Sequence, residues 1–117
     1  MNQKVLKQWI AELKIWAKKS TLYHLRFPLR MESVIGDLVS PEGVLCLLHS
    51  KETGTKWTPE PEEKGQLRSS LWYFDETLGT PKKVLEWAGL TSGLMCNIRR
   101  INDEQGFEGV IKHLESL

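Results

Sequence analysis

The side chains best suited to metal binding or nucleophilic chemistry in this chain of 117 residues are two cysteines and two of its three histidines. Cys46 and His49 lie three residues apart, so on a helix they would share a face. With Cys96 and His113 they offer the ligand types of a zinc site, but the sequence lacks the closely spaced ligand pairs of zinc fingers and ribbons. A thiol among leucines should have a raised pKa, which argues against Cys46 as a nucleophile with His49 as its base. We therefore predict two buried free thiols, no metal and no cofactor.

The acidic residues offer no better catalytic arrangement. Glu60, Glu62 and Glu63 lie in a proline-containing segment in which nothing would hold two carboxylates at a catalytic distance. The sequence also contains no glycine-rich phosphate loop and no convincing set of Ser, His and Asp. We predict no catalytic residue and favour a protein that is not an enzyme, while the question of catalysis stays open.

Five tryptophans are many for a chain of this length. The simplest interpretation is a small core filled by large side chains. Trp57 and Trp72, however, flank a polar segment with few apolar residues, so we expect at least one of them to be solvent-accessible. Aromatic and arginine side chains dominate the binding energy of protein interfaces, which predicts a binding patch of Trp57, Arg68, Trp72 and Tyr73. A ligand pocket and the core are the alternative locations for these aromatic residues.

Charge is distributed unevenly along the chain. Residues 1–30 hold seven Lys or Arg and one acidic residue, Glu12. One interpretation is a basic binding surface that includes Lys14, Lys18 and Lys19, and the other is a helix that packs against an acidic body. Arginine grips phosphate better than lysine, and its absence from residues 3–18 weakens the nucleic-acid interpretation.

The most apolar run, residues 40–49, predicts the helix around which the core forms. Ser40 is a good N-cap, Pro41 fits the first helical position, and Gly54 is a suitable terminator. A buried strand over residues 44–49 is the alternative, because periodicity alone cannot distinguish the two. The residues expected to share one core are Val44, Leu45, Leu48, Leu85, Ile98, Val110 and Ile111.

The remaining elements follow from periodicity and from turn residues. Further helices are predicted over 3–18, from Thr80-Pro81 to Gly89, and over 94–101 and 107–114, with Asn102-Asp103 as an interruption. Strands are predicted around Tyr23, Leu25 and Phe27, over Met31 to Ile35, and over 71–74, with Gly36-Asp37 as a turn. The fold class is therefore α+β and mainly helical, with about five short helices and a small antiparallel sheet or hairpin from residues 23–35 and 56–74. We predict a single compact domain over 1–117, with a basic amphipathic helix at 1–19 and a polar loop at 58–70.

Three segments carry a family resemblance. They are Gly43-Val44-Leu45-Cys46, then Pro81, Val84 and Glu86-Trp87-Ala88-Gly89-Leu90, and finally Ile101-Asn102-Asp103, Phe107, Ile111 and Leu114-Glu115. In this order and spacing, residues 40–117 resemble a family of small uncharacterised proteins found mainly in bacteriophages and bacteria. The resemblance implies a similar fold and a phage-like origin, and it implies no particular reaction.

The chain departs from that family's pattern at several positions. Pro41-Glu42 replaces a pair of cysteines, Leu47 replaces an acidic residue, Gly79-Thr80 replaces a leucine before proline, and Gly106 replaces a serine. If those cysteines or that acidic residue share a chemical role in the family, this chain has lost it.

We therefore expect a non-enzymatic, phage-type accessory protein that binds a host or partner protein. The alternatives are nucleic-acid binding through the basic N-terminal segment and a small-ligand-binding domain with an aromatic pocket. The sequence has no apolar run long enough to span a bilayer and no signal-peptide pattern, so we expect no membrane association and a soluble protein of the cytoplasm, the host cytoplasm if a phage encodes it.

Overall fold

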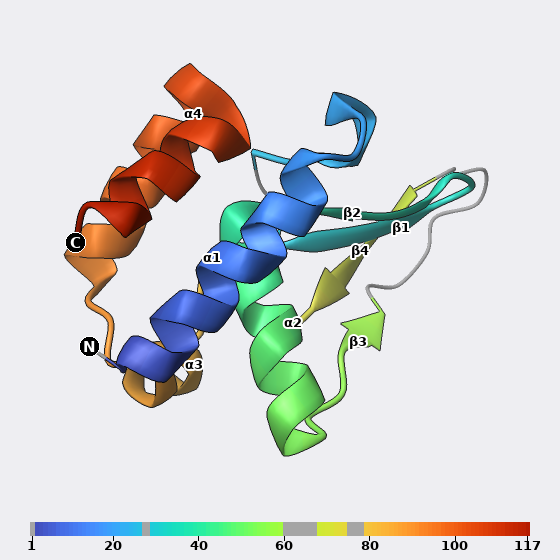
Figure 1. Cartoon of the computed structure of the whole chain (residues 1–117). Coiled ribbons are helices and arrows are strands. Elements are labelled where there is room, and N and C mark those ends of the chain that lie inside the picture. The colour runs from blue at the N-terminus through green and yellow to red at the C-terminus, as the bar shows by residue number, and fades with distance from the viewer. Residues whose placement is uncertain (1, 27–28, 60–67, 75–78) are drawn as a thin grey trace.

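The helices and strands of the chain are described by a computed structural model for residues 2–26, 29–59, 68–74 and 79–117 (Figure 1). The helices in these ranges are α1 (Gln3–Ala17), the short 3-10 helix η1 (Thr21–Tyr23), α2 (Pro41–Thr53), α3 (Lys82–Ala88) and α4 (Ser92–Glu115). The strands are β1 (Arg30–Ser33), β2 (Gly36–Val39), β3 (Thr58–Pro59) and β4 (Arg68–Trp72). The predicted mainly helical α+β class with a small antiparallel sheet is confirmed.

The helices surround one hydrophobic core. α1 packs against α2 and α4, and the short helix α3 packs against α2 (Figure 1). Trp9 of α1 is fully buried, and its indole N–H donates to the carbonyl oxygen of Pro41 at 2.9 Å. Most of the predicted core residues are buried in this cluster: Val44, Leu45, Ile98, Val110 and Ile111. Leu48 and Leu85 are only partly buried and pack against its margin.

The local signals of α2 act as predicted, so the alternative of a buried strand over residues 44–49 is wrong. The Ser40 hydroxyl accepts a hydrogen bond from the backbone N–H of Gly43 at 3.1 Å, and Pro41 occupies the first helical position. Gly54 ends the helix in the left-handed conformation with a φ of 74°, which glycine adopts at little cost.

The sheet has the strand order β2-β1-β4-β3, and all neighbouring strands are antiparallel. β1 and β2 form a hairpin that projects away from the helices (Figure 1). The predicted turn at Gly36-Asp37 is wrong by two residues: Val34 and Ile35 form the turn, and Gly36 opens β2 with a φ of 118°. β2 was not predicted, because the sequence pattern indicates a turn at its first two residues and a connection to α2 at its last two.

The strand predicted around Tyr23 and Leu25 is also wrong. The Ser20 hydroxyl accepts a hydrogen bond from the backbone N–H of Leu22, which favours the tight turn of η1 over an extended chain. Among the described residues of this segment, His24 forms an isolated bridge with Val39, and Phe27 lies outside the described residues.

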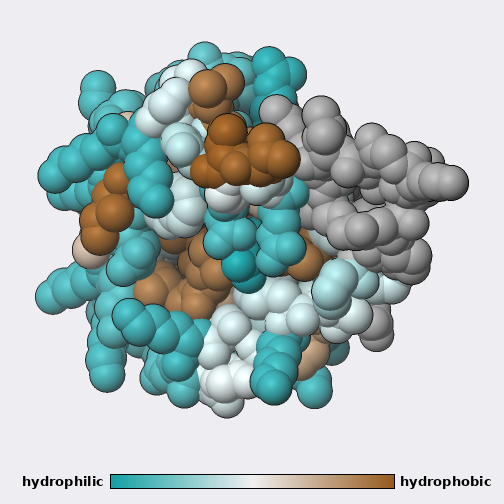
Figure 2. All heavy atoms as spheres, turned by 90° about the vertical axis from the view of Figure 1, so that its right-hand side faces the viewer, coloured by the Kyte–Doolittle hydropathy of each residue, from teal (hydrophilic) through white to brown (hydrophobic). Residues whose placement is uncertain are grey.

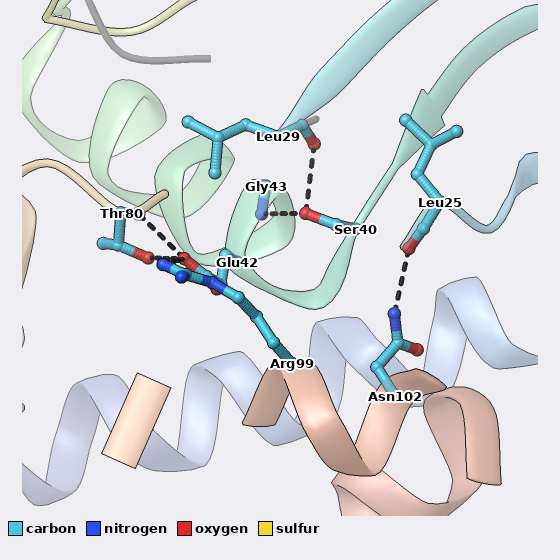
Figure 3. A network of polar contacts seen from close by, with 8 residues as sticks. All are labelled: Leu25, Leu29, Ser40, Glu42, Gly43, Thr80, Arg99 and Asn102. Carbon is cyan, nitrogen blue, oxygen red and sulfur yellow. Dashed lines mark hydrogen bonds and ion pairs between the residues drawn. The ribbon is translucent and has the colours of Figure 1, made fainter. Parts of the chain in front are cut away.

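The predicted interruption at Asn102-Asp103 does not occur, so the described residues hold four α-helices where about five were expected. α4 continues through both residues, because the Asn102 amide donates to the Leu25 carbonyl oxygen at 3.0 Å instead of capping a new helix (Figure 3). The helical path is interrupted at Gly106, with φ 70° and ψ −166°. Glycine tolerates a positive φ, which explains why the interruption falls there.

Two boundaries differ from prediction near the polar loop and α3. Residues 58–59 and 68–70 of the predicted loop belong to β3 and β4, and the residues between them lie outside the described ranges. Thr80 does not cap α3, since Pro81 occupies the N-cap position and the Thr80 hydroxyl donates to Glu42. Gly89 ends α3 in the left-handed conformation, as predicted.

Candidate functional site

Of the residues predicted to form an aromatic patch, Tyr73 is paired with a buried histidine, His49 of α2. Tyr73 is fully buried, and its hydroxyl oxygen lies 2.5 Å from Nδ1 of His49. The ring of Trp87 meets the His49 ring edge-on, with centroids 5.0 Å apart. As placed, the Tyr73 ring contributes to the core rather than to the surface.

Trp57 lies at the margin of this cluster, and both Trp57 and Trp72 are half-buried. The Trp57 ring packs on Tyr73 at a centroid distance of 4.6 Å, and the Arg30 guanidinium lies 5.3 Å from the Trp57 centroid. The indole nitrogens of Trp57 and Trp72 are buried without a hydrogen-bond partner in the part of the chain that the structure describes. Arg68 opens β4 opposite Ser33, and its side chain lies outside the description.

The electrostatics of this cluster favour uncharged side chains. Burial lowers the pKa of His49, although the nearby charge of Glu52 opposes that effect. Burial also raises the pKa of Tyr73 and that of the Cys46 thiol, and the charge of Glu42 raises the Cys46 pKa further. A thiol with a raised pKa is a poor nucleophile at neutral pH, as the sequence predicted for Cys46.

The two cysteines occupy different environments. Cys46 is buried as predicted, but Cys96 is exposed, because it lies on the side of α4 that faces away from the core residues Met95 and Ile98. The described residues contain no group of three or more His, Cys, Asp or Glu side chains that could hold a metal ion.

A buried carboxylate organises the polar contacts between three segments (Figure 3). Glu42 is 3% exposed and accepts hydrogen bonds from the backbone N–H and hydroxyl of Thr80, at 2.7 and 2.6 Å. Arg99 of α4 donates to both carboxylate oxygens, and these hydrogen bonds raise its pKa. The arrangement joins α2 to α4 and to the segment before α3, and its burial indicates a structural role.

The three lysines predicted to form a basic surface have different contacts. The Lys14 ammonium pairs with the Glu115 carboxylate of α4 at 3.3 Å, in line with the interpretation that this helix packs against acidic residues. Lys18 caps the C-terminal end of α1 and is exposed. The Lys19 ammonium lies 4.2 Å from the Trp16 ring centroid and 5.8 Å from that of Tyr23.

Lys19 lies at a hollow of about 530 Å³ between the end of α1, η1 and the β1–β2 hairpin. Its lining consists of Trp16, Lys19, Ser20, Tyr23, Ile35, Gly36 and Asp37. Beside it, Val34 and Ile35 at the hairpin turn are 85% and 45% exposed. Figure 2 views the molecule from the side to which the hairpin projects and shows apolar side chains gathered on that surface. We call the hollow together with Val34 the hairpin-end surface.

Sequence reasoning missed this surface, because it assigned Val34 and Ile35 to a strand. The signal that could have identified them is their position between Ser33 and Gly36, because serine and glycine both favour turns. The approach of the hairpin to Trp16 and Tyr23 depends on η1, which was not predicted.

Comparison with known families matches residues 1–108 to a family described as a domain of unknown function, DUF8296. The chain belongs to this family. The match to DUF8296 is consistent with the predicted relationship to uncharacterised proteins, and it attaches no activity to the site. No curated protein and no solved structure matches this DUF8296 chain. None of the helices in its described residues combines the length and the apolar character needed to cross a bilayer.

Proposed function

We propose that the chain acts by binding a partner protein and not by catalysis, and that the hairpin-end surface is its contact site. The observation that carries this proposal is the exposure of Val34, which is 85%, at the tip of a projecting hairpin. Burying an aliphatic side chain of this kind stabilises a complex, because apolar area is removed from water. Ile35 and the hollow beside it extend the apolar contact.

The contacts of the basic residues support a protein partner over a nucleic acid. Lys14 is paired with Glu115, and residues 3–18 contain no arginine. A surface that binds a phosphate backbone usually presents several free cationic side chains, with arginine prominent. Nucleic-acid binding through the N-terminal segment is the alternative outcome of the experiment below.

The burial of Tyr73 also argues against the aromatic ligand pocket that was considered from the sequence. Its ring is enclosed by Trp57 and Phe74, with centroid distances of 4.6 and 4.9 Å. Together with the resemblance to small phage and bacterial proteins, this favours a phage-type accessory protein whose partner is a host protein in the cytoplasm.

The experiment compares capture of proteins from nuclease-treated host lysate by the wild type, Val34→Asp and Leu117→Asp. Leu117 follows α4 and is 54% exposed, so Leu117→Asp removes an exposed aliphatic side chain far from Val34 in sequence. We expect a retained partner that Val34→Asp no longer captures and that Leu117→Asp captures normally. Equal capture by both variants would overturn the proposed site, and capture that disappears with nuclease would favour the nucleic-acid alternative.

A further inference from the structure

The outer edge of β2 is open at one residue. β2 is a terminal strand of the sheet, and its backbone groups alternate between facing β1 and facing outward. At the end of the pairing, the backbone N–H of Ser40 donates to Leu29 at 3.1 Å, on the β1 side. Val39 faces the other way, since its carbonyl oxygen accepts from the N–H of Leu25 at 2.7 Å. By the same alternation, the N–H and C=O of Asp37 point outward.

No hydrogen bond to the outward N–H and C=O of Asp37 occurs within the described ranges. The segment that pairs with Val39 turns away into η1 before it reaches Asp37. Asp37 instead lines the hollow of the hairpin-end surface. An unpaired edge of this kind is a template for an added strand.

The hollow also has a defined charge. The Asp37 carboxylate is neutralised by the Arg30 guanidinium, through hydrogen bonds of 3.2 and 2.9 Å. The Lys19 ammonium faces the Trp16 ring and has no carboxylate partner among the residues that the structure describes. The net charge presented to a ligand is therefore positive.

We propose that the hollow binds an extended acidic peptide segment of the partner protein. The segment pairs with the backbone of Asp37 as an added strand, places an apolar side chain against Ile35 and Tyr23, and directs a carboxylate to Lys19. Side chains two residues apart face the same side of a strand, so the recognised segment carries an apolar and an acidic residue separated by one position. This inference rests on the proposed function and specifies the chemistry of the partner.

The first test pans a phage-displayed library of random twelve-residue peptides against the full chain. We expect enrichment of sequences with an aliphatic or aromatic residue two positions away from Asp or Glu. Binding of a selected synthetic peptide should perturb Trp16 fluorescence and the backbone amide resonance of Asp37. Enriched peptides that lack acidic residues, or that leave the Asp37 amide unperturbed, would overturn the inference.

The second test uses a matched pair of charge reversals on or next to α1. Lys19→Glu should weaken the selected peptide by about tenfold or more, because like charges would then face each other in the hollow. Lys7→Glu makes the same charge change at an exposed position and should leave the dissociation constant unchanged. Equal effects of the two variants would reduce Lys19 to a general electrostatic contribution and contradict the proposed contact.

Competition and partner capture separate the two proposals. A twelve-residue oligothymidylate that displaces the peptide would show that the hollow selects anions rather than acidic peptides, which contradicts the inference. If Val34→Asp abolishes partner capture but Lys19→Glu does not, partner binding stands and the acidic-segment inference fails. If the selected peptide binds the hollow but Val34→Asp captures the partner normally, the inference stands and the role of the hairpin tip fails.

Discussion

The guanidinium of Arg99 lies against the carboxylate of Glu42, which is 57 positions earlier in the sequence and almost completely buried. Glu42 is on the first turn of α2, and Arg99 is in the N-terminal half of α4. A carboxylate removed from water in this way depends on its donors, because an uncompensated buried charge is costly.

Replacement of Arg99 should therefore destabilise the fold, although nearly half of its own side chain is exposed, at 44%. We expect Arg99→Met to lower the free energy of unfolding by about 3 kcal/mol, the lower end of the range for breaking a buried pair. Arg100→Met, at an exposed neighbouring position, should change it by less than about 0.5 kcal/mol. Denaturant unfolding of the two variants measures the difference, and equal values would show that Thr80 alone satisfies Glu42.

Gly43 should be irreplaceable, because the first turn of α2 lies directly against the backbone of Leu29, the residue before β1. A Cβ atom at Gly43 would lie 1.7 Å from the Leu29 carbonyl oxygen. We expect Gly43→Ala to cost about 3 kcal/mol or more, since a backbone atom must move. Gly93, also in the first turn of a helix, has open space around its Cβ position apart from Thr91 at 3.9 Å. Gly93→Ala should leave the free energy of unfolding unchanged or raise it by up to about 1 kcal/mol. A stable Gly43→Ala variant would contradict the close packing of α2 on Leu29.

The buried His49 should make stability depend on pH in the acidic range. Its pKa is lowered in the folded protein, so the unfolded chain binds the proton first as pH falls below about 6.5. The unfolded state then holds more protons, and the free energy of unfolding must fall with pH until the folded-state pKa is passed. We expect the loss of stability between pH 7.5 and pH 5 to be larger for the wild type than for His49→Gln.

The other titrating groups are common to both proteins, so their contributions largely cancel in this comparison. Urea unfolding at several pH values measures it. Parallel pH profiles for the two proteins would show that His49 protonates equally well in the folded and unfolded chains.

Two leucines of α2 should differ in their contribution to stability. Leu45 is fully buried, and Leu45→Ala should cost about 2–5 kcal/mol through lost burial and the cavity that remains. Leu48 is partly buried and lines a hollow between α1 and α2, so Leu48→Ala should cost less than about 2 kcal/mol. Chemical denaturation of both variants tests this ranking. A larger loss for Leu48→Ala would contradict the orientation of α2 about its axis, with Leu45 facing the core.

The elements whose start and stop residues lie close together in the sequence could be predicted. Ser40, Pro41 and Gly54 determine α2 through contacts within a few residues, and Gly89 ends α3 in the same way. The strand over β1 and the turn of the hairpin were within two residues of their positions. Burial of Cys46 and the raised pKa of its thiol also followed from its apolar neighbours.

Contacts between distant segments could not be predicted. Asn102 resembles a helix-breaking residue until the Leu25 carbonyl is brought to it, 77 positions away in sequence. Thr80 resembles an N-cap until Glu42 competes for its hydroxyl. The hollow of the hairpin-end surface likewise requires Trp16, Tyr23 and Asp37 to meet, and no local pattern contains all three.

The packing of α1 against α4 has a consequence for the order in which the chain is synthesised. α1 leaves the ribosome early, yet the core face of this helix, with Trp9 and Leu13, is covered in part by α4, which is made after every other helix described here. Until α4 emerges, the apolar stripe of α1 has only part of its final cover. Until then the nascent chain exposes part of a tryptophan-bearing amphipathic helix, which is the type of surface that chaperones bind. Completion of this core must therefore wait until α4 has left the ribosome.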